Sequence, residues 1–414
     1  MRSSLAEERH NIEYEEQRAF LRRQAREAER RAHDPRVIRQ EKLERAGRLR
    51  DILAVFTLFF VLAAVIVFYA ENYSYTTYSL DFELSEETLT GAKLFSFKDG
   101  CIAVTRDSVS FLSGNTVRYT NTCAYQTPVV KAEGDYFVVF DRGGYQLRIY
   151  DEGGVTGTVR LTRKVYAADI SATGVIAVFT ESSDAAYISY FDRFGNRISV
   201  ELRTIPEESG YPLDIDISPN GQRLAVSYYA AEGGTGSSRL MVYDFEHGKA
   251  DEQYAIYRTS DEDTDDIVFL NDVCFVSDTQ LYAVGEDTLF FLTLDASGNV
   301  TVKKHTPADP IVSVFTAGTR LGTVMESGVT RHCRIYRENG EVYSDFQVPA
   351  SFRHLAANAR YLAFTDGTEV SFYNLSGRKR YEGALTDEVD SVVLTGRRSL
   401  LVSTGAFLQK ITLK

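Results

Sequence analysis

Residues 190–202, YFDRFGNRISVEL, show the pattern on which the fold prediction rests. An apolar strand with aromatic residues leads to an Asp, a tight turn containing Gly follows, and a second short strand leaves the turn. Gly suits this turn because tight hairpins require a positive φ, which side chains disfavour. The pattern occurs seven times, with turn glycines at Gly114, Gly153, Gly195, Gly248, Gly298, Gly340 and Gly377.

These glycines are spaced 39, 42, 53, 50, 42 and 37 residues apart, so the repeat is about forty residues long. Between them lie short runs of Val, Ile, Phe and Tyr bounded by turn residues, and no segment after Ala70 keeps a helical period over twelve residues. The class is therefore all-β. Repeats of this length with four short strands are typical of β-propeller blades, whose faces are covered by neighbouring blades.

Seven hairpins predict seven blades, and the two ends of the repeat region predict an eighth. Residues 392–413 supply about three further strands, and TYSLDFE at 77–83 is a candidate for the missing fourth. We therefore expect eight blades, closed by strands from both ends of the chain. Seven blades is the alternative, and a pair of β-sandwiches is disfavoured because it does not explain the period.

An apolar run occupies Ile52–Ala70, nineteen residues without a charge. A helix of this length reaches about 28 Å, close to the thickness of the bilayer hydrocarbon. A cleaved signal peptide is the rival interpretation, but its apolar core is shorter and small residues follow it, whereas Phe68-Tyr69 stands here. The run predicts an uncleaved signal anchor that crosses the membrane once.

Residues 1–50 carry 14 Lys and Arg against 10 Asp and Glu and are rich in helix-forming residues. Asp34-Pro35 predicts an N-cap and first position of a second helix ending near Arg50. Leu5 and Ile12 begin a heptad pattern that fails at Arg26, so we expect a solvated charged helix, with a coiled coil as the alternative.

The charges on either side of the apolar run predict its orientation. Residues 30–50 hold eight Lys and Arg, and none follows the run until Lys93. Basic residues resist translocation, so we expect residues 1–50 in the cytoplasm and the propeller at 75–414 outside the cell membrane. Tyr69, Tyr73 and Tyr75 suit the outer interface, and the basic side suits anionic lipid of the bilayer.

Composition excludes several classes of protein. Hydrophobic residues make up 44% of the chain, too many for a disordered protein, and four cysteines are too few for a disulfide scaffold. The net charge of -12 argues against nucleic acid as a partner, because phosphate binding needs a basic surface.

One turn carries a family resemblance. Ser218-Pro219-Asn220-Gly221, within ISPNGQRLAV, is similar to the repeat of WD40-like propellers of bacterial envelope proteins. The layout of basic segment, anchor and propeller resembles an uncharacterised family of membrane-anchored WD40-like or quinoprotein-like propeller proteins from Gram-positive bacteria. The resemblance implies the fold and not a function. Quinoprotein propellers carry a Trp in each blade motif and this chain has no Trp, so no cofactor is expected.

Candidate chemistry is sparse. No nucleophile elbow, H-E-x-x-H pair or P-loop occurs, and the six His are scattered, so we name no catalytic residue and do not expect an enzyme. The densest carboxylate cluster includes Asp261, Asp263 and Asp265; it lacks the Gly and Glu of an EF-hand, and we favour a polar connector over a Ca²⁺ site.

Other candidate features have two interpretations each. Residues 232–238, EGGTGSS, are expected to be a hairpin insertion, with a binding loop as the alternative. The four cysteines show no C-x-x-C; Cys101 and Cys123 are the first candidates for a disulfide, and buried thiols are the alternative.

The sequence is compatible with three functions. The first is a binding platform in the cell envelope that holds a protein or a wall polymer, which we favour because of the anchor and the missing catalytic motifs. The second is a ligand sensor that signals through the cytoplasmic helices, and the third is an envelope hydrolase.

Overall fold

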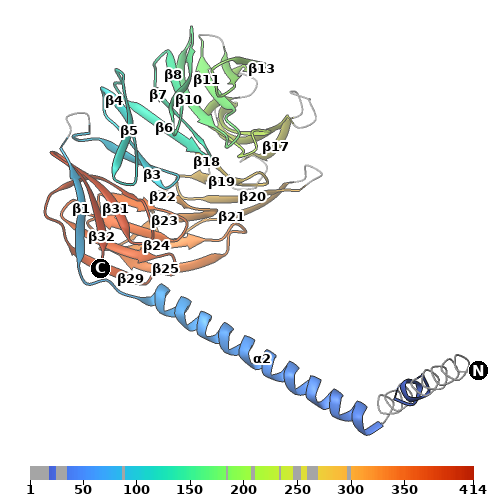
Figure 1. The fold of residues 1–414 in the computed structure, drawn as a ribbon. Helices are drawn as coiled ribbons and strands as arrows, with labels where there is room; N and C mark the ends of the chain where they lie inside the picture. The colour runs from blue at the N-terminus through green and yellow to red at the C-terminus, as the bar shows by residue number, and fades with distance from the viewer. Residues whose placement is uncertain are drawn as a thin grey trace, which may run out of the picture. The chain divides into compact units, whose positions relative to one another are not determined.

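The computed structural model describes residues 18–24, 35–85, 89–182, 185–206, 210–232, 235–245, 253–258, 269–295 and 300–414. The chain divides into two compact units, Met1–Tyr73 and Ser74–Lys414. The first unit is helical where it is described, and the second consists of β-sheets (Figure 1).

The helical unit contains a short helix over 18–24 and the helix α2 (Pro35–Asn72) of 38 residues. Helix α2 begins at the expected Pro, whose missing N–H is not needed in the first turn. It continues past Arg50, where we expected the charged helix to end, because neither Gly nor Pro follows there. Leu5, Ile12 and Arg26, which decide between coiled coil and charged helix, lie outside the described residues.

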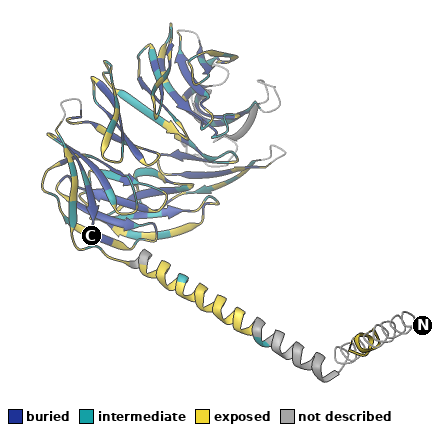
Figure 2. Cartoon of the chain, viewed as in Figure 1, coloured by how far each residue is buried: buried dark blue, intermediate teal, exposed yellow. Residues whose placement is uncertain are grey.

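The apolar part of α2 has the dimensions of a membrane span. Among the described residues, one helical segment, Arg50–Tyr69, is both long enough and apolar enough to cross a membrane. Its side chains are exposed around nearly the whole helix (Figure 2). At about 1.5 Å per residue, 20 residues reach about 30 Å, the hydrocarbon thickness of a bilayer.

In the second unit, the described residues form eight four-stranded antiparallel sheets. The sheets, from inner to outer strand, are β2 (Lys93–Phe97), β3 (Gly100–Val104), β4 (Ser108–Ser113), β5 (Thr116–Thr122); β6 (Pro128–Glu133), β7 (Tyr136–Asp141), β8 (Gln146–Asp151), β9 (Gly154–Arg160); β10 (Lys164–Ile170), β11 (Ile176–Glu181), β12 (Ala186–Phe191), β13 (Arg197–Thr204); β14 (Tyr211–Ile217), β15 (Arg223–Glu232), β16 (Thr235–Asp244), β17 (Gln253–Arg258); β18 (Leu270–Ser277), β19 (Gln280–Gly285), β20 (Leu289–Leu294), β21 (Val300–His305); β22 (Ile311–Ala317), β23 (Arg320–Ser327), β24 (Thr330–Tyr336), β25 (Val342–Val348); β26 (His354–Ala357), β27 (Tyr361–Thr365), β28 (Glu369–Asn374), β29 (Lys379–Ala384); and β30 (Val389–Leu394), β31 (Ser399–Thr404), β32 (Leu408–Leu413) with β1 (Tyr78–Leu84).

The last sheet closes the ring with strands from both ends of the unit. Strand β1 pairs antiparallel with β32, from Tyr78 opposite Leu413 to Leu84 opposite Leu408. Three further backbone hydrogen bonds join Thr76 and Thr77 to Lys414. The prediction of eight blades, with residues 77–83 as the missing strand, is confirmed.

Hydrophobic side chains fill the space between each sheet and the next. Eight buried clusters each draw residues from two neighbouring sheets, so every interface around the ring is packed within the described residues. Between the first two sheets, the rings of Phe137 and Tyr150 stack at 4.8 Å and Phe97 meets Phe137 edge-on at 5.0 Å. Apolar burial stabilises a protein by about 25 cal/mol per Å². A blade gains this stabilisation only where a neighbouring blade covers its faces, so we do not expect an isolated blade to be stable.

The turn glycines behave largely as the hairpin pattern predicts. Positive φ values occur at four of the seven: Gly114 (62°), Gly195 (84°), Gly340 (74°) and Gly377 (87°). Gly153 differs because its neighbour Gly154 takes the positive φ, 129°. Gly248 and Gly298 lie outside the described residues.

The Ser-Pro-Asn-Gly turn joins β14 to β15 within one sheet and is hydrogen-bonded to the next sheet. Gly221 has a φ of 76°, and the Ser218 hydroxyl accepts the backbone N–H of Arg223 at 2.9 Å. The N–H of Asn220 donates to the Asp278 carboxylate of the next sheet at 2.8 Å. The turn that resembles the WD40-like repeat therefore has a structural role.

A buried arginine fixes the chain just before β1. The Arg380 guanidinium lies 5.1 Å from the ring centre of Tyr75 and 5.5 Å from that of Tyr361, and Arg380 is 2% exposed. The Tyr75 N–H donates to the Arg380 carbonyl at 2.6 Å. Tyr75, which we expected at the membrane interface, is thus half-buried against the propeller.

Candidate functional site

The ring has two chemically different ends. Because the four strands of each sheet alternate in direction, one end carries the connections between second and third strands and the crossings to the next sheet, such as 105–107 and 123–127. We call this the groove end. The opposite end carries the remaining turns, including 218–222 and 192–196.

The inner strands of the sheets line a central channel. On the edge that faces the channel, these strands have no neighbouring strand in their own sheet to accept their backbone N–H groups. Unpaired backbone donors in a protein interior need acceptors. Three aspartates supply them, each to the inner strand of the next sheet. Asp169 Oδ2 on β10 accepts from Ile217 N at 2.9 Å, and on β14 Asp216 Oδ1 accepts from Phe275 N at 2.8 Å and Asp214 Oδ2 from Val273 N at 3.0 Å.

These carboxylates surround one lysine. Burial favours the neutral form of Lys131, but Asp169, Asp216, Asp214 and Asp272 raise its pKa above the ordinary value. Burial raises the pKa of Asp214 to about 7, against the opposing attraction of Lys131, and also raises the pKa values of Asp169 and Asp216. Asp169 and Asp216 are each 7% exposed. Lys131 is therefore the counter-charge of a buried acidic channel.

A cavity of about 480 Å³ extends from this cluster toward the opposite end of the channel. Lys131, Glu133, Asp169, Asp216 and Thr316 are among its lining residues. Within the described part of the chain, no three His, Cys, Asp or Glu side chains are arranged to hold a metal ion. Asp169, Asp214 and Asp216 accept backbone donors of the next sheet, which indicates a structural role for these three carboxylates.

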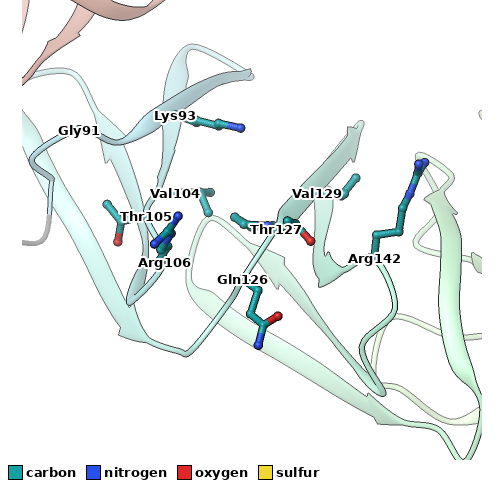
Figure 3. Close-up of a pocket in the computed structure, with 10 residues that line it drawn as sticks. Gly91, Lys93, Val104, Thr105, Arg106, Gln126, Thr127, Val129 and Arg142 are labelled. Atoms are coloured by element: carbon teal, nitrogen blue, oxygen red, sulfur yellow. The ribbon is translucent and has the colours of Figure 1, made fainter.

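The groove end has a larger cavity, of about 660 Å³, between the β2–β5 and β6–β9 sheets (Figure 3). We call it the basic groove. It is lined by Gly91, Lys93, Val104, Thr105, Arg106, Gln126, Thr127, Pro128, Val129 and Arg142. The cations Lys93, Arg106 and Arg142 come from three separate segments around it, as Figure 3 shows.

Local hydrogen bonds hold the segments that form the basic groove. The carbonyl of Arg106 accepts the N–H of Tyr125 at 2.7 Å. The carboxylate of Asp141 accepts the N–H groups of Gln126, at 2.9 and 3.0 Å, and of Thr127, at 2.8 Å. These hydrogen bonds fix the connection at 123–127, which joins the two sheets and contributes Gln126 and Thr127 to the lining of the groove.

The charge of the basic groove is opposite to that of its surroundings. Residues 71–414 hold 47 Asp and Glu against 32 Lys and Arg, yet the described residues that line the groove include three cations and no carboxylate. Lys93, Arg106 and Arg142 are exposed, and none of them forms an ion pair with another described residue. No structural role therefore accounts for the three cations together.

The candidate residues from the sequence do not form this groove. Asp261, Asp263 and Asp265 lie outside the described residues. The four cysteines are free thiols, with Cys101 and Cys333 buried. Within residues 232–238, the described residues Glu232 and Thr235–Ser238 belong to strands β15 and β16, and Glu232 opposes Thr235, as expected of a hairpin insertion.

Solved structures with the same architecture show the fold. BamB from Moraxella catarrhalis matches with a TM-score of 0.50 and 16% identity, over 81% of this chain and 100% of that chain. Apo AztD from Citrobacter koseri matches with a TM-score of 0.51 and 12% identity, over 76% of this chain and 90% of that chain. At these identities the likeness concerns the propeller fold alone.

Two further comparisons concern the sequence itself. No curated protein matches the chain. Residues 71–413 match the model described as "Family of unknown function (DUF5711)", which covers the whole propeller and leaves out most of α2. This chain is therefore a member of the DUF5711 family.

Proposed function

We propose that this protein is a single-pass membrane protein whose propeller lies outside the cell membrane and holds a protein or polymer of the cell envelope. The membrane part of the proposal is supported by the exposed apolar segment Arg50–Tyr69. The orientation is supported by the eight Lys and Arg in residues 30–50 and by their absence between Asp51 and Lys93.

The observation that carries the binding role is the basic groove. The three channel aspartates bond to backbone donors of the next sheet, so the fold accounts for them. The groove cations are exposed beside a cavity of about 660 Å³ and form no ion pair with another described residue. Loops on a rigid propeller are suited to binding because the ring holds them in place.

Photo-crosslinking in intact cells tests this proposal. A benzophenone amino acid at Gln126 lies in the basic groove, and one at Phe194 lies in an exposed turn at the opposite end. We expect the Gln126 variant of the full chain to capture a discrete envelope partner, and the Phe194 variant to capture much less of it.

Two results would contradict the proposal. Equal capture from both positions would show that the groove end is not the binding end. Labelling of residues 1–50, but not of the propeller, by a membrane-impermeant reagent added to whole cells would place the propeller in the cytoplasm.

A further inference from the structure

We infer that the basic groove is an anion-binding site for phosphate groups. The inference rests on the proposed binding role of the groove end and names the chemistry of its ligand. It starts from the described lining residues, which include two arginines, one lysine and no carboxylate around one cavity, in a unit with an excess of acidic residues.

The types of cation favour oxyanions. An Arg guanidinium presents a planar fork of N–H donors that fits the oxygens of phosphate or carboxylate, and Lys adds a compact positive charge. A phosphate monoester carries about -1.5 to -2 charges at neutral pH, while a carboxylate carries one. Lys93, Arg106 and Arg142 together therefore match a phosphate-bearing ligand better than a single carboxylate.

The segments carrying the cations are held before any ligand arrives. The Thr105 hydroxyl accepts the N–H groups of Asp107 at 3.2 Å and Ser108 at 3.0 Å, which fixes the turn of Arg106. The N–H of Gly143 donates to the Val165 carbonyl at 2.6 Å, which fixes the turn of Arg142. Preorganised turns reduce the entropy lost on binding.

Neutral donors complete the site. The side chains of Gln126 and Thr127 line the cavity between the cations and, among the described residues, make no hydrogen bond of their own. Both oxygens of the neighbouring Asp141 accept backbone N–H groups of Gln126 and Thr127, and none of the ion pairs among the described residues joins Asp141 to Arg142. Amide and hydroxyl donors can bond to phosphate oxygens that the cations leave open.

The size of the cavity bears on the length of the ligand. A volume of about 660 Å³ is within the range of about 300–1,000 Å³ for small-molecule sites and exceeds what one phosphate group needs. The three cations are also distributed around the groove instead of converging on one point (Figure 3). The ligand class is therefore a chain or headgroup with two or more anionic groups.

Calorimetric titration of the full chain in uncharged detergent tests the site, with sodium tripolyphosphate as the probe. We expect saturable binding that weakens as salt is added. Arg106→Gln and Arg142→Gln should each weaken binding by about tenfold or more, because each removes a charge-assisted bond. Arg160→Gln, an exposed arginine on β9 of the same sheet, is the matched control and should bind as the wild type does.

Further probes separate the sources of phosphate. Tighter binding of tripolyphosphate assigns free or polymeric phosphate. Tighter binding of bis(glycerophospho)glycerol, a deacylated lipid headgroup with two phosphate groups, assigns a lipid headgroup. Either result supports the inference if the two arginine variants lose the binding. Poly-glutamate that binds more tightly than either probe, with the same losses, would assign an acidic protein and overturn the phosphate inference.

Two outcomes distinguish this inference from the proposed function. Absence of binding of both tripolyphosphate and bis(glycerophospho)glycerol, or equal losses in Arg106→Gln and Arg160→Gln, overturns the phosphate site. If the Gln126 crosslink still captures an envelope partner, the platform survives that failure. Melting curves of each variant check that its propeller is folded.

Discussion

Arg380→Ala is expected to lower the free energy of unfolding by about 3 kcal/mol, because it empties a buried site and removes two cation–π contacts. Arg380 is 2% exposed between the rings of Tyr75 and Tyr361, and its guanidinium also donates to both hydroxyls, at 3.4 and 3.3 Å. Loss of the Arg380 side chain should loosen the chain just before β1. Denaturant unfolding of the full chain in detergent measures the change in the free energy of unfolding.

Limited proteolysis supplies a local measurement for the same variant. We expect faster cleavage within residues 73–77 of Arg380→Ala, because Tyr75 no longer has its partner. Arg397→Ala, an exposed arginine in the next sheet, is the control and should change stability by less than about 0.5 kcal/mol. Equal stability of the two variants would show that Arg380 does not hold this segment.

Lys131→Met is expected to lower the free energy of unfolding by about 3 kcal/mol at pH 8. The variant leaves Asp169, Asp214, Asp216 and Asp272 without the cation that now faces them. In the wild type the raised pKa of Lys131 means that its contribution is present at pH 8 and is lost at high pH only as the pH rises above about 10.5 and through the folded-state value.

The pH dependence distinguishes this electrostatic effect from lost packing. The pKa of Asp214 is already raised to about 7, and removing Lys131 raises it further. The folded variant therefore takes up protons that replace the missing cation as the pH falls, and the difference from wild type should shrink to less than about 1 kcal/mol at pH 5. A difference that stays constant between pH 5 and pH 8 would contradict the counter-charge role; exposed Lys164→Met is the control.

The fold was predictable because its signals are periodic. The hairpins at Gly114, Gly195, Gly340 and Gly377 show the repeat, and residues 77–83 alternate as a strand should. The length of α2 was harder to predict, because the change from charged to apolar residues at Arg50 alters the surroundings of a helix without ending it.

The basic groove was not predictable, because its cations come from three separate segments and form no motif. Lys93 begins an inner strand, while Arg106 and Arg142 lie in turns of different sheets. The alternation of Asp214 and Asp216 was visible in YPLDIDI, but their acceptor role depends on Val273 and Phe275, 59 residues further along the chain. Such pairings arise from the ring and not from local spacing.

A disulfide between the two ends of the propeller tests the closed ring most directly. Ser79 and Thr412 are opposite each other in the β1–β32 pair, and opposite residues in antiparallel strands have the separation a disulfide needs. With the four native cysteines replaced by alanine, we expect Ser79→Cys with Thr412→Cys to form an intramolecular disulfide in most chains under mild oxidation. Ser79→Cys with Gln409→Cys, whose own partner is Glu83, should not. Failure of the first pair, or equal linkage in both, would contradict closure by the strand that follows the apolar helix.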